Sequence, residues 1–374
     1  MDNQSNRLIS LDMFRGFTIA LMILVNNPGS WSYVYAPLRH AEWHGWTPTD
    51  LVFPFFLFIV GVALSLSFSK RIEQGDKESQ LLIKVIRRTL IIFAIGLFLS
   101  LFPFFNFAKL RIPGVLQRIA VCYFFASTIF LYANKKLQVA WTIFLLVIYW
   151  ILMKTIPVPE FGAGVMEPEG NLCWFIDSTL LAGFTWSGAP VPGFDPEGIF
   201  STIPAIATVM FGVFTGDWIR SNKGHYEKVA GLFVAGNILL VLGVIMDVWL
   251  PINKGLWTSS YSVFMAGMAI NFLAVCYWII DIKGYQNWTK PFVVFGSNAI
   301  TVYALSALVA RITIYTKWTQ EDGLKISLKT FLYENLFHSW AGDYFASLLY
   351  PVTWILIYLG LMWILYRKKI FIKI

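Results

Sequence analysis

Charged side chains are scarce in this chain of 374 residues, since only 13% of the residues are Asp, Glu, Lys or Arg and 57% are hydrophobic. Soluble domains carry roughly a quarter of their residues as charges, so this chain lacks the charge needed to cover a water-facing surface. Apolar runs long enough to cross a bilayer recur along the whole sequence. These features argue against a soluble protein and predict an all-α polytopic membrane protein.

Cysteine is scarce as well. The three cysteines, Cys122, Cys173 and Cys276, have no metal-ligand spacing, and Cys122 and Cys276 fall inside apolar runs. Neither a disulfide framework nor a zinc site is therefore expected, and we predict that the protein binds no metal.

Basic residues give the chain a formal net charge of +8, but they are scattered between the apolar segments. This pattern is typical of a bias tied to membrane orientation rather than of a nucleic-acid-binding surface. The expected partner is the lipid bilayer, and no nucleic acid is expected.

A helix needs about 20 apolar residues to cross the hydrocarbon core, and ten segments meet this requirement. No small-residue cleavage site precedes the first of them, so we expect a retained first span rather than a signal peptide. No internal repeat is evident, which predicts a single transmembrane domain over residues 1–374. The predicted spans are 11–29, 48–69, 84–105, 112–133, 138–157, 198–219, 229–250, 258–280, 291–313 and 345–366.

The distribution of Lys and Arg predicts the orientation. No basic residue lies between Lys154 and Arg220, a stretch that includes the long loop 158–197. Because basic residues concentrate on the cytoplasmic side, an even number of spans places both termini in the cytoplasm. The outer loops are then 28–47, 158–197 and 314–344.

Two of the four histidines, His40 and His44, immediately precede the second predicted span. Their spacing of four is that of helical zinc-binding pairs, but the nearest acid is Glu42 rather than the residue directly after the first histidine, and no third ligand is evident. Both residues also fit a wet interfacial loop rich in aromatic side chains. For His44 this interfacial role is preferred. For His40 a chemical role competes with it, because a neutral imidazole carries protons near neutral pH.

Other polar residues fall within or beside predicted spans, where ionisable groups usually face a cavity or a partner. Asp12 and Arg15 are three residues apart and can pair on one helix face. Arg111 and Arg118 are seven apart, which predicts that they share one face of the fourth span. Arg118 either binds a ligand or forms a structural ion pair, for example with Asp50 or Asp12.

Two outer segments carry further charges. In DPEGI (195–199), Asp195 or Glu197 can cap the sixth span, and in PINKGLW (251–257), Lys254 can simply snorkel to the interface. Together the polar residues predict a cavity that opens outward and is lined from spans one, two, four and six. Such a cavity fits a transporter and a membrane enzyme equally well.

Seven sequence blocks lie in order along nearly the whole chain: SLDMFRG (10–16), MILVN (22–26), HAEWHGWTPTDLVFPFFLFIVG (40–61), KLRIPGVLQR (109–118), DPEGI (195–199), PINKGLWTSSY (251–261) and YRKKIFIKI (366–374). Through these blocks the chain resembles the heparan-α-glucosaminide N-acetyltransferase-like family of transmembrane acyltransferases. The animal lysosomal member has a lumenal domain and a preceding span that this chain does not show. We therefore expect a compact bacterial form in the inner membrane, with its active-site loop facing the periplasm.

The resemblance implies that acetyl moves from cytosolic acetyl-CoA to the amine of a glucosamine-type sugar on the outer side. The family's active histidine matches His40, as base or transient acyl carrier, and its accompanying asparagine matches Asn26. His44 falls where the lysosomal enzyme has Asn, so we expect it to be dispensable. The lysosomal relative also makes a homodimer possible.

The remaining assignments concern the two substrates. Arginines near the cytoplasmic face or within the membrane can hold the phosphates of CoA, although the same residues suit membrane anchoring; the candidates are Arg15, Arg87, Arg88 and Arg118. The candidates for contact with the acceptor sugar are Trp43, Asp50, Glu197, Lys254 and Trp257. The alternatives are a permease for amino sugars such as N-acetylglucosamine, and a non-catalytic membrane scaffold.

Overall fold

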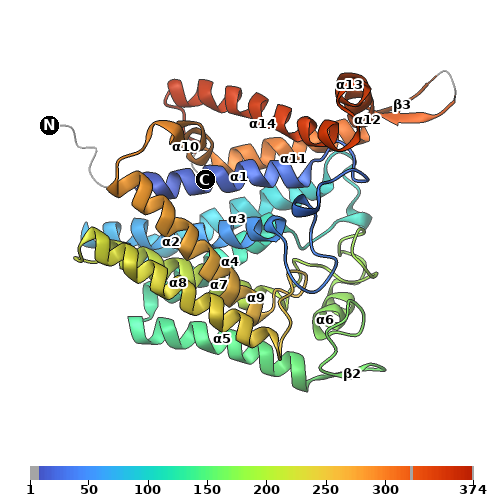
Figure 1. The fold of residues 1–374 in the computed structure, drawn as a ribbon. Helices are drawn as coiled ribbons and strands as arrows, with labels where there is room; N and C mark the ends of the chain where they lie inside the picture. The colour runs from blue at the N-terminus through green and yellow to red at the C-terminus, as the bar shows by residue number, and fades with distance from the viewer. Residues whose placement is uncertain (1–7, 321–322, 373–374) are drawn as a thin grey trace.

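Long, nearly parallel helices form most of the protein (Figure 1). The structure is a computed structural model that describes residues 8–320 and 323–372. In these ranges, 8 helices are long and apolar enough to cross a membrane, and a bent pair raises the number to 9. The eight comprise α1 (Ile9–Asn26), α2 (Val52–Glu73) with its preceding turn, α4 (Val115–Tyr132), α5 (Lys135–Thr155), α7 (Thr202–Arg220), α8 (His225–Asp247), α9 (Ser259–Cys276) with its π-helical extension, and α14 (Asp343–Arg367). The all-α membrane fold is thus confirmed.

Two of the ten predicted spans differ from expectation. The ninth, 291–313, is broken at Asn298 into α10 (Lys290–Ser297) and α11 (Ala299–Tyr315), whose axes differ by 72°. Asn298 bridges the break to the C-terminal segment, since it donates to the carbonyl oxygen of Ile370 and accepts from the amide of Ile372. The third predicted span corresponds to α3 (Glu78–Leu101). Its first half carries several charged residues, so α3 is not among the eight helices that are apolar enough to cross a membrane.

Close contacts between helix backbones hold the bundle together. A Cβ atom on Gly61 of α2 would lie 1.9 Å from the carbonyl oxygen of Val209 in α7, and one on Gly212 would lie 2.1 Å from that of Phe58. Small residues allow membrane helices to approach closely enough for extensive van der Waals packing. The pair α2 and α7 is therefore a fixed central unit, and the end at which α2 begins carries much of the candidate site.

The start of α1 is fixed by a residue distant in sequence. Asp281, in the π-helical turn Tyr277–Ile282, accepts hydrogen bonds from the amides of Ile9 and Ser10, each at 3.1 Å. A carboxylate is a favourable partner for the unpaired amides at a helix N-terminus. This contact fixes where α1 begins and hence which of its side chains face the bundle interior.

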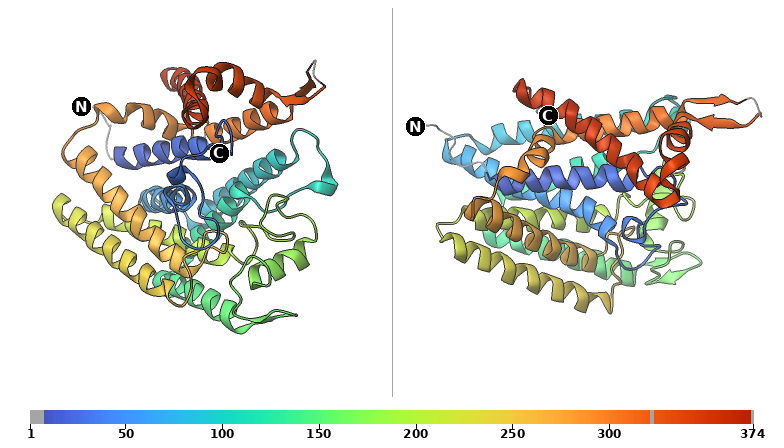
Figure 2. Two further views of the ribbon diagram at one scale, coloured as in Figure 1. Left: turned by 45° about the vertical axis from the view of Figure 1, so that its right-hand side comes forward. Right: turned by 45° about the horizontal axis from the view of Figure 1, so that its top comes forward.

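Irregular segments gather at one end of the bundle, on the right in Figure 1, and both views in Figure 2 show them at the same end. They include the short helix α6 (Leu172–Leu181), α12 (Leu328–Tyr333) and α13 (Ser339–Ala341). Two small antiparallel hairpins lie there too, β1 (Pro157–Val158) with β2 (Gly162–Ala163) and β3 (Lys317–Thr319) with β4 (Lys325–Ser327). The segments predicted to be the outer loops thus share one end of the molecule.

The close approach of α2 and α7 generates a stability prediction. Gly61→Ala should lower the free energy of unfolding by about 3 kcal/mol, because the added methyl group overpacks the contact with the α7 backbone. Thermal unfolding in detergent measures the effect. The control is Gly360→Ala in α14, where no atom lies within 4 Å of the new Cβ. Equal melting temperatures for the two variants would contradict the assigned packing.

Candidate functional site

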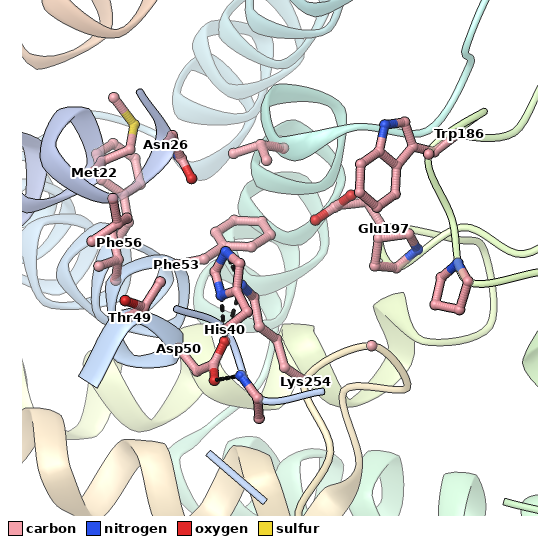
Figure 3. Close-up of a pocket in the computed structure, with 18 of the residues that line it drawn as sticks. Met22, Asn26, His40, Thr49, Asp50, Phe53, Phe56, Trp186, Glu197 and Lys254 are labelled. Carbon is pink, nitrogen blue, oxygen red and sulfur yellow. Dashed lines mark hydrogen bonds and ion pairs between the residues drawn. The ribbon is translucent and has the colours of Figure 1, made fainter. Parts of the chain in front are cut away.

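A cavity of about 480 Å³ lies among the irregular segments. Side chains from α1, α2, α4 and α11 line its inner part, and the segments 40–50, 186–197 and 254–255 line its outer part. Six of the residues proposed from the sequence meet in it, and Figure 3 labels all of them except Trp43. These residues are Asn26, His40, Trp43, Asp50, Glu197 and Lys254.

His40 is fixed by a buried carboxylate. Its Nδ1 lies 2.6 Å from Oδ1 of Asp50, which is only 1% exposed, whereas the side chain of His40 is 42% exposed. The other ring nitrogen is turned toward the space between Asn26 and Glu197 (Figure 3). When Asp50 accepts from Nδ1–H, the lone pair of Nε2 faces the cavity, where the Nζ of Lys254 lies 3.4 Å from it.

The local sequence explains why Asp50 is so placed. In TPTD, Pro48 begins a short 3₁₀ helix (Pro48–Leu51), and Thr47 and Asp50 form a reciprocal capping box. Oδ2 of Asp50 accepts from the amides of Thr47 and Ala41, both at 3.0 Å. The backbone carbonyl of Asp50 accepts from the hydroxyl of Tyr261 at 2.7 Å. One residue therefore organises both the turn before α2 and the loop that carries His40.

Lys254 reaches the same pair from a distant segment. Its Nζ lies 2.9 Å from Nδ1 of His40 and 3.3 Å from Oδ1 of Asp50. Burial lowers the pKa of Lys254, although Asp50 and Glu197 partly oppose that shift. The neighbouring Asn253 ties this segment to the His40 loop by donating to the carbonyl oxygen of Trp43 at 2.9 Å. Lys254 is thus part of the site and not simply an interfacial anchor.

One face of α1 forms a stripe along the cavity. Thr18, Met22 and Asn26 line it at helical spacings of four, and Arg15 continues the same face one turn toward the start of the helix. Arg15 itself contacts Asp12 and the carbonyl oxygen of Gly296, so the predicted Asp12–Arg15 pair is confirmed. The stripe leads from the His40 end of the cavity toward the other end of the bundle.

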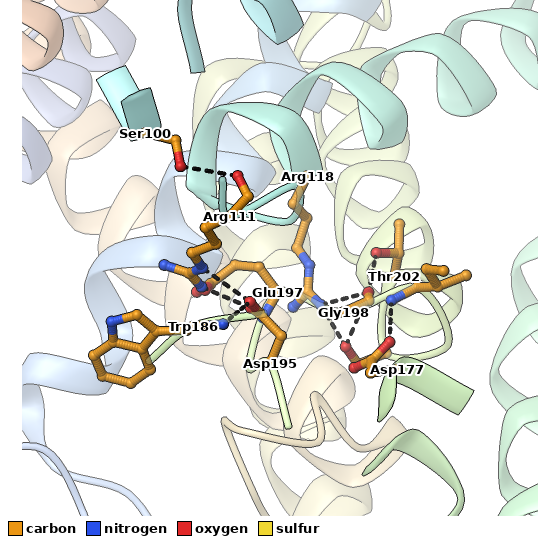
Figure 4. A network of polar contacts seen from close by, with 11 residues as sticks. Ser100, Arg111, Arg118, Asp177, Trp186, Asp195, Glu197, Gly198 and Thr202 are labelled. Atoms are coloured by element: carbon orange, nitrogen blue, oxygen red, sulfur yellow. Dashed lines mark hydrogen bonds and ion pairs between the residues drawn. The ribbon is translucent and has the colours of Figure 1, made fainter. Parts of the chain in front are cut away.

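Opposite His40, an ion cluster forms the far wall (Figure 4). Arg111 donates to both oxygens of Asp195, at 2.9 and 2.6 Å, and also contacts Glu197. Burial alone would lower the pKa of Arg111, but Glu197 and Asp195 raise it above its ordinary value. Burial would raise the pKa of Glu197, but the net shift is downward because of Arg111, Arg118 and Lys254. Glu197 is therefore ionised where it faces the cavity.

Two expectations about these charges are wrong. Arg111 and Arg118 do not share a helix face, because Pro113 and Gly114 delay the start of α4 until Val115 and leave Arg111 in an extended segment. Asp195 and Glu197 do not cap the sixth span. Both bind Arg111 instead, and α7 begins later, at Thr202.

Residues 7–245 match the family model described as heparan-alpha-glucosaminide N-acetyltransferase, catalytic. The chain is 30% identical to the human protein named heparan-alpha-glucosaminide N-acetyltransferase, with 98% of this chain and 60% of the human protein aligned. It is 29% identical to the mouse protein of the same name, with 100% of this chain and 61% of that protein aligned. This chain belongs to that family. It spans about 60% of the length of these relatives.

In this member of the heparan-alpha-glucosaminide N-acetyltransferase family, His44 lies outside the cavity. Its Nδ1 is 3.2 Å from the side-chain nitrogen of Asn253. Trp43 does line the cavity, fixed by its Nε1 donating to the carbonyl oxygen of Met166 at 2.8 Å and by an edge contact with Phe194. Trp43 and His44 are adjacent in the sequence, but only Trp43 lines the cavity.

Arg118 and Trp257 are buried together below the cavity floor. Arg118 donates to the carbonyl oxygen of Gly198 and to the hydroxyl of Ser201, and its guanidinium lies 5.1 Å from the ring centre of Trp257. Neither Asp50 nor Asp12 is its partner, so the ion pair suggested by the sequence is wrong. Trp257 is 1% exposed and does not line the cavity, so we do not retain it as a sugar contact.

Three arginines proposed for CoA lie away from this cavity. Arg15 is at the first turns of α1, and Arg87 and Arg88 lie in the first half of α3. Arg88 is placed over the ring of Tyr123 at 5.0 Å. Within residues 8–320 and 323–372, no group of three or more His, Cys, Asp and Glu residues is arranged to hold a metal.

Some cavity residues were missed by sequence reasoning. Trp186 lies beside Arg111, with the guanidinium 5.4 Å from its ring centre, and its amide donates to Asp195 at 2.9 Å. Tyr303 enters from α11 and Thr18 from α1. Only Thr18 had a usable sequence signal, since it shares the helical spacing of Asn26. The others reach the cavity through tertiary contacts.

Asp177 in α6 generates a prediction about pH. Its Oδ1 accepts from the amide of Ile199 at 2.9 Å, and burial raises its pKa from the ordinary value of 3.8 to about 7. The folded state therefore holds the proton more tightly than the unfolded state. The ionisation of Asp177 therefore lowers the free energy of unfolding as the pH rises from about 4 to about 7. Above about pH 7 the loss is complete and stays constant.

Asp177→Asn removes this dependence, because the amide cannot ionise. We expect the variant to melt above the parent protein at about pH 8 and to lose this advantage progressively as the pH falls to about 4. Thermal unfolding in detergent across that range is the measurement. A constant difference between the two proteins would show that Asp177 does not carry the shifted proton.

Proposed function

We propose that the protein is a transmembrane acetyltransferase that moves acetyl from cytosolic acetyl-CoA to the amine of a glucosamine-type sugar on the outer side. Membership of the family supports the reaction class. The observation that carries the proposal is the 2.6 Å contact between His40 Nδ1 and the buried Asp50 at the edge of a cavity. A histidine oriented by a buried carboxylate is suited to general base or nucleophilic catalysis.

The bond changes define what the residues must do. The amine nitrogen bonds to the acetyl carbon, the thioester C–S bond breaks, and a proton from the amine ends on the CoA thiol. Nε2 of His40 takes the proton if the amine attacks the thioester directly. It instead holds the acetyl group if transfer passes through an acyl-imidazole. Both routes need the same tautomer, with Nδ1–H donated to Asp50.

Two charged side chains flank His40 in the site. The Nζ of Lys254 lies 2.9 Å from Nδ1 and 3.4 Å from Nε2, and the carboxylate of Asp50 can stabilise a positive charge that develops on the ring during transfer. Asn26 supplies an amide N–H for the oxygen of the thioester carbonyl as negative charge develops on it. Such oxyanion contacts contribute about 3 kcal/mol in a dry site.

The stripe on α1 supports a route for the acyl donor. From Asn26 to Arg15 the helix rises about 16 Å, a length comparable to the extended pantetheine arm of CoA. We propose that the arm lies along Thr18 and Met22, with Arg15 near the phosphates. Arg87 and Arg88 remain candidates for the nucleotide end, because they lie on the α3 segment that is predicted to face the cytoplasm.

The outer part of the cavity has the chemistry of an amino-sugar site. Trp43 and Trp186 offer aromatic faces to a pyranose ring. Glu197 is ionised and can bind the acceptor's ammonium form before it loses a proton. Asp50 and Lys254 lie close enough to contact sugar hydroxyls beside His40. We place this end in the periplasm of a bacterial inner membrane, with both chain termini in the cytoplasm, and a homodimer remains a prediction from the resemblance.

The central assignment predicts a large difference between the two histidines of one loop. His40→Ala should lower acetyl transfer by about 10²- to 10⁴-fold, the usual contribution of an acid–base group, and should lower the melting temperature only modestly, because the buried Asp50 loses one of several partners. His44→Ala is the matched control and should retain most of the rate. Product formation from acetyl-CoA and glucosamine is the measurement. Equal losses in both variants would contradict the role given to His40.

Transport is tested in proteoliposomes loaded with acetyl-CoA and given external glucosamine. The proposed enzyme should release acetylated sugar outside and leave free CoA inside. Unmodified sugar accumulating inside, with the internal acetyl-CoA intact, would instead indicate a permease. A scaffold would do neither.

A further inference from the structure

A second cavity, of about 770 Å³, lies on the other side of the ion cluster. It is a groove between α4 and α5, and the start of α7 contributes to its wall. Positions 118, 121, 125, 129 and 132 of α4 line it at helical spacings, so it follows the helix for about 21 Å. Its lining is mostly apolar, with Phe125, Ile129, Trp141 and Leu145 as examples. A groove of this length and character fits a hydrocarbon chain.

The polar end of the groove holds Arg118, which is 2% exposed. Its Nη2 is used by Gly198 and Ser201, but Nε and Nη1 have no hydrogen-bond partner among the described residues. Buried arginine N–H groups are costly to leave unpaired. The ring of Trp257 stabilises the positive charge but supplies no acceptor atom in the plane of the guanidinium. The unused donors point to a ligand with anionic oxygens, such as a phosphate.

The two cavities are close neighbours. Glu197 lines both of them, Pro196 and Arg111 line the first, and Gly198 and Ile112 line the second. Segments 111–113 and 196–198 and the first turns of α4 lie between them, and Figure 4 shows Arg111, Glu197, Gly198 and Arg118 at this boundary. Because Glu197 lines both cavities, a molecule whose chain lies in the groove and whose head group reaches Glu197 also borders the cavity of His40.

We propose that the acceptor is a lipid-linked amino sugar: its hydrocarbon chain lies in the α4–α5 groove, its phosphate accepts from Arg118, and its amine reaches His40. This inference rests on the proposed acetyl transfer and names the class of acceptor. CoA does not fit the groove, because a nucleotide and several phosphates would have to lie against an apolar wall with one arginine. A phosphodiester adds a single negative charge, opposite in sign to the buried guanidinium of Arg118.

Four acceptors separate the parts of this proposal: glucosamine, glucosamine 1-phosphate, octyl glucosaminide, and glucosamine joined to farnesol through a phosphodiester. Initial rates of acetylation are measured with the full chain in nanodiscs and saturating acetyl-CoA. We expect kcat/KM for the farnesyl phosphodiester to exceed that for glucosamine about 100-fold, because its chain concentrates it in the membrane beside the groove and its phosphate accepts charged hydrogen bonds from Arg118. Glucosamine 1-phosphate carries only the phosphate and octyl glucosaminide only a hydrocarbon chain, so their kcat/KM values should lie between those of the other two acceptors.

Two variants obstruct the groove from opposite walls. Val121→Trp on α4 and Leu145→Trp on α5 should remove most of the preference for the farnesyl phosphodiester while leaving acetylation of free glucosamine unchanged. The matched control is Val147→Trp, two residues along α5, which is 42% exposed and does not line the groove. It should keep the preference. The melting temperature and the rate with free glucosamine show whether each variant is folded. If one blocking variant fails to fold, the other one tests the proposal.

Three outcomes are distinguishable. Acetylation of glucosamine without any advantage for the farnesyl phosphodiester overturns the lipid-linked acceptor but leaves the proposed function standing. If the farnesyl phosphodiester keeps its advantage in both blocking variants, its hydrocarbon chain binds outside the α4–α5 groove. That result also overturns the assignment, and it is the one expected if the groove holds only an ordinary phospholipid. Failure to acetylate all four acceptors would count against the proposed function itself.

Discussion

The contact between Asp50 and His40 is the interaction on which the candidate site depends. A carboxylate that is 1% exposed is stable only when its oxygens are satisfied, and here the partners are the His40 ring, the amides of Ala41 and Thr47, and Lys254. Each of these partners belongs to a segment that has no regular structure of its own. The need to satisfy one buried charge thus shapes the loop, orients the imidazole and brings a distant lysine to the site.

That carboxylate is in turn positioned by the helix bundle. The capping box places Asp50 at the start of α2, and the tight contact of α2 with α7 around Gly61 leaves little freedom for that helix end. Tyr261 of α9 holds the carbonyl oxygen of the same residue. The candidate loop is thereby attached to a closely packed helix pair, which is the arrangement that preorganised chemistry requires.

The ion cluster has a comparable role on the opposite wall. Arg111, with Asp195 and Glu197, lines the cavity of His40, whereas Arg118 faces the apolar groove. The two arginines belong to one short sequence block, KLRIPGVLQR, yet Pro113 and Gly114 direct them to different surroundings. A single wall of paired charges therefore separates a polar space from a hydrocarbon-like one, and Glu197 contacts both.

The sequence by itself determined the membrane class, most of the helices and the site residues that have strong chemical identities. Low charge and apolar runs are properties of composition, and the blocks around His40, Asn26, Glu197 and Lys254 are local in the chain. Only the tertiary structure decided which charges meet. Arg118 pairs with Gly198 and Ser201 rather than an acid, Trp257 is buried, and Trp186 and Tyr303 enter the cavity. The physical reason is that helix period and composition act over a few residues, whereas a cavity wall is set by how distant segments pack around it.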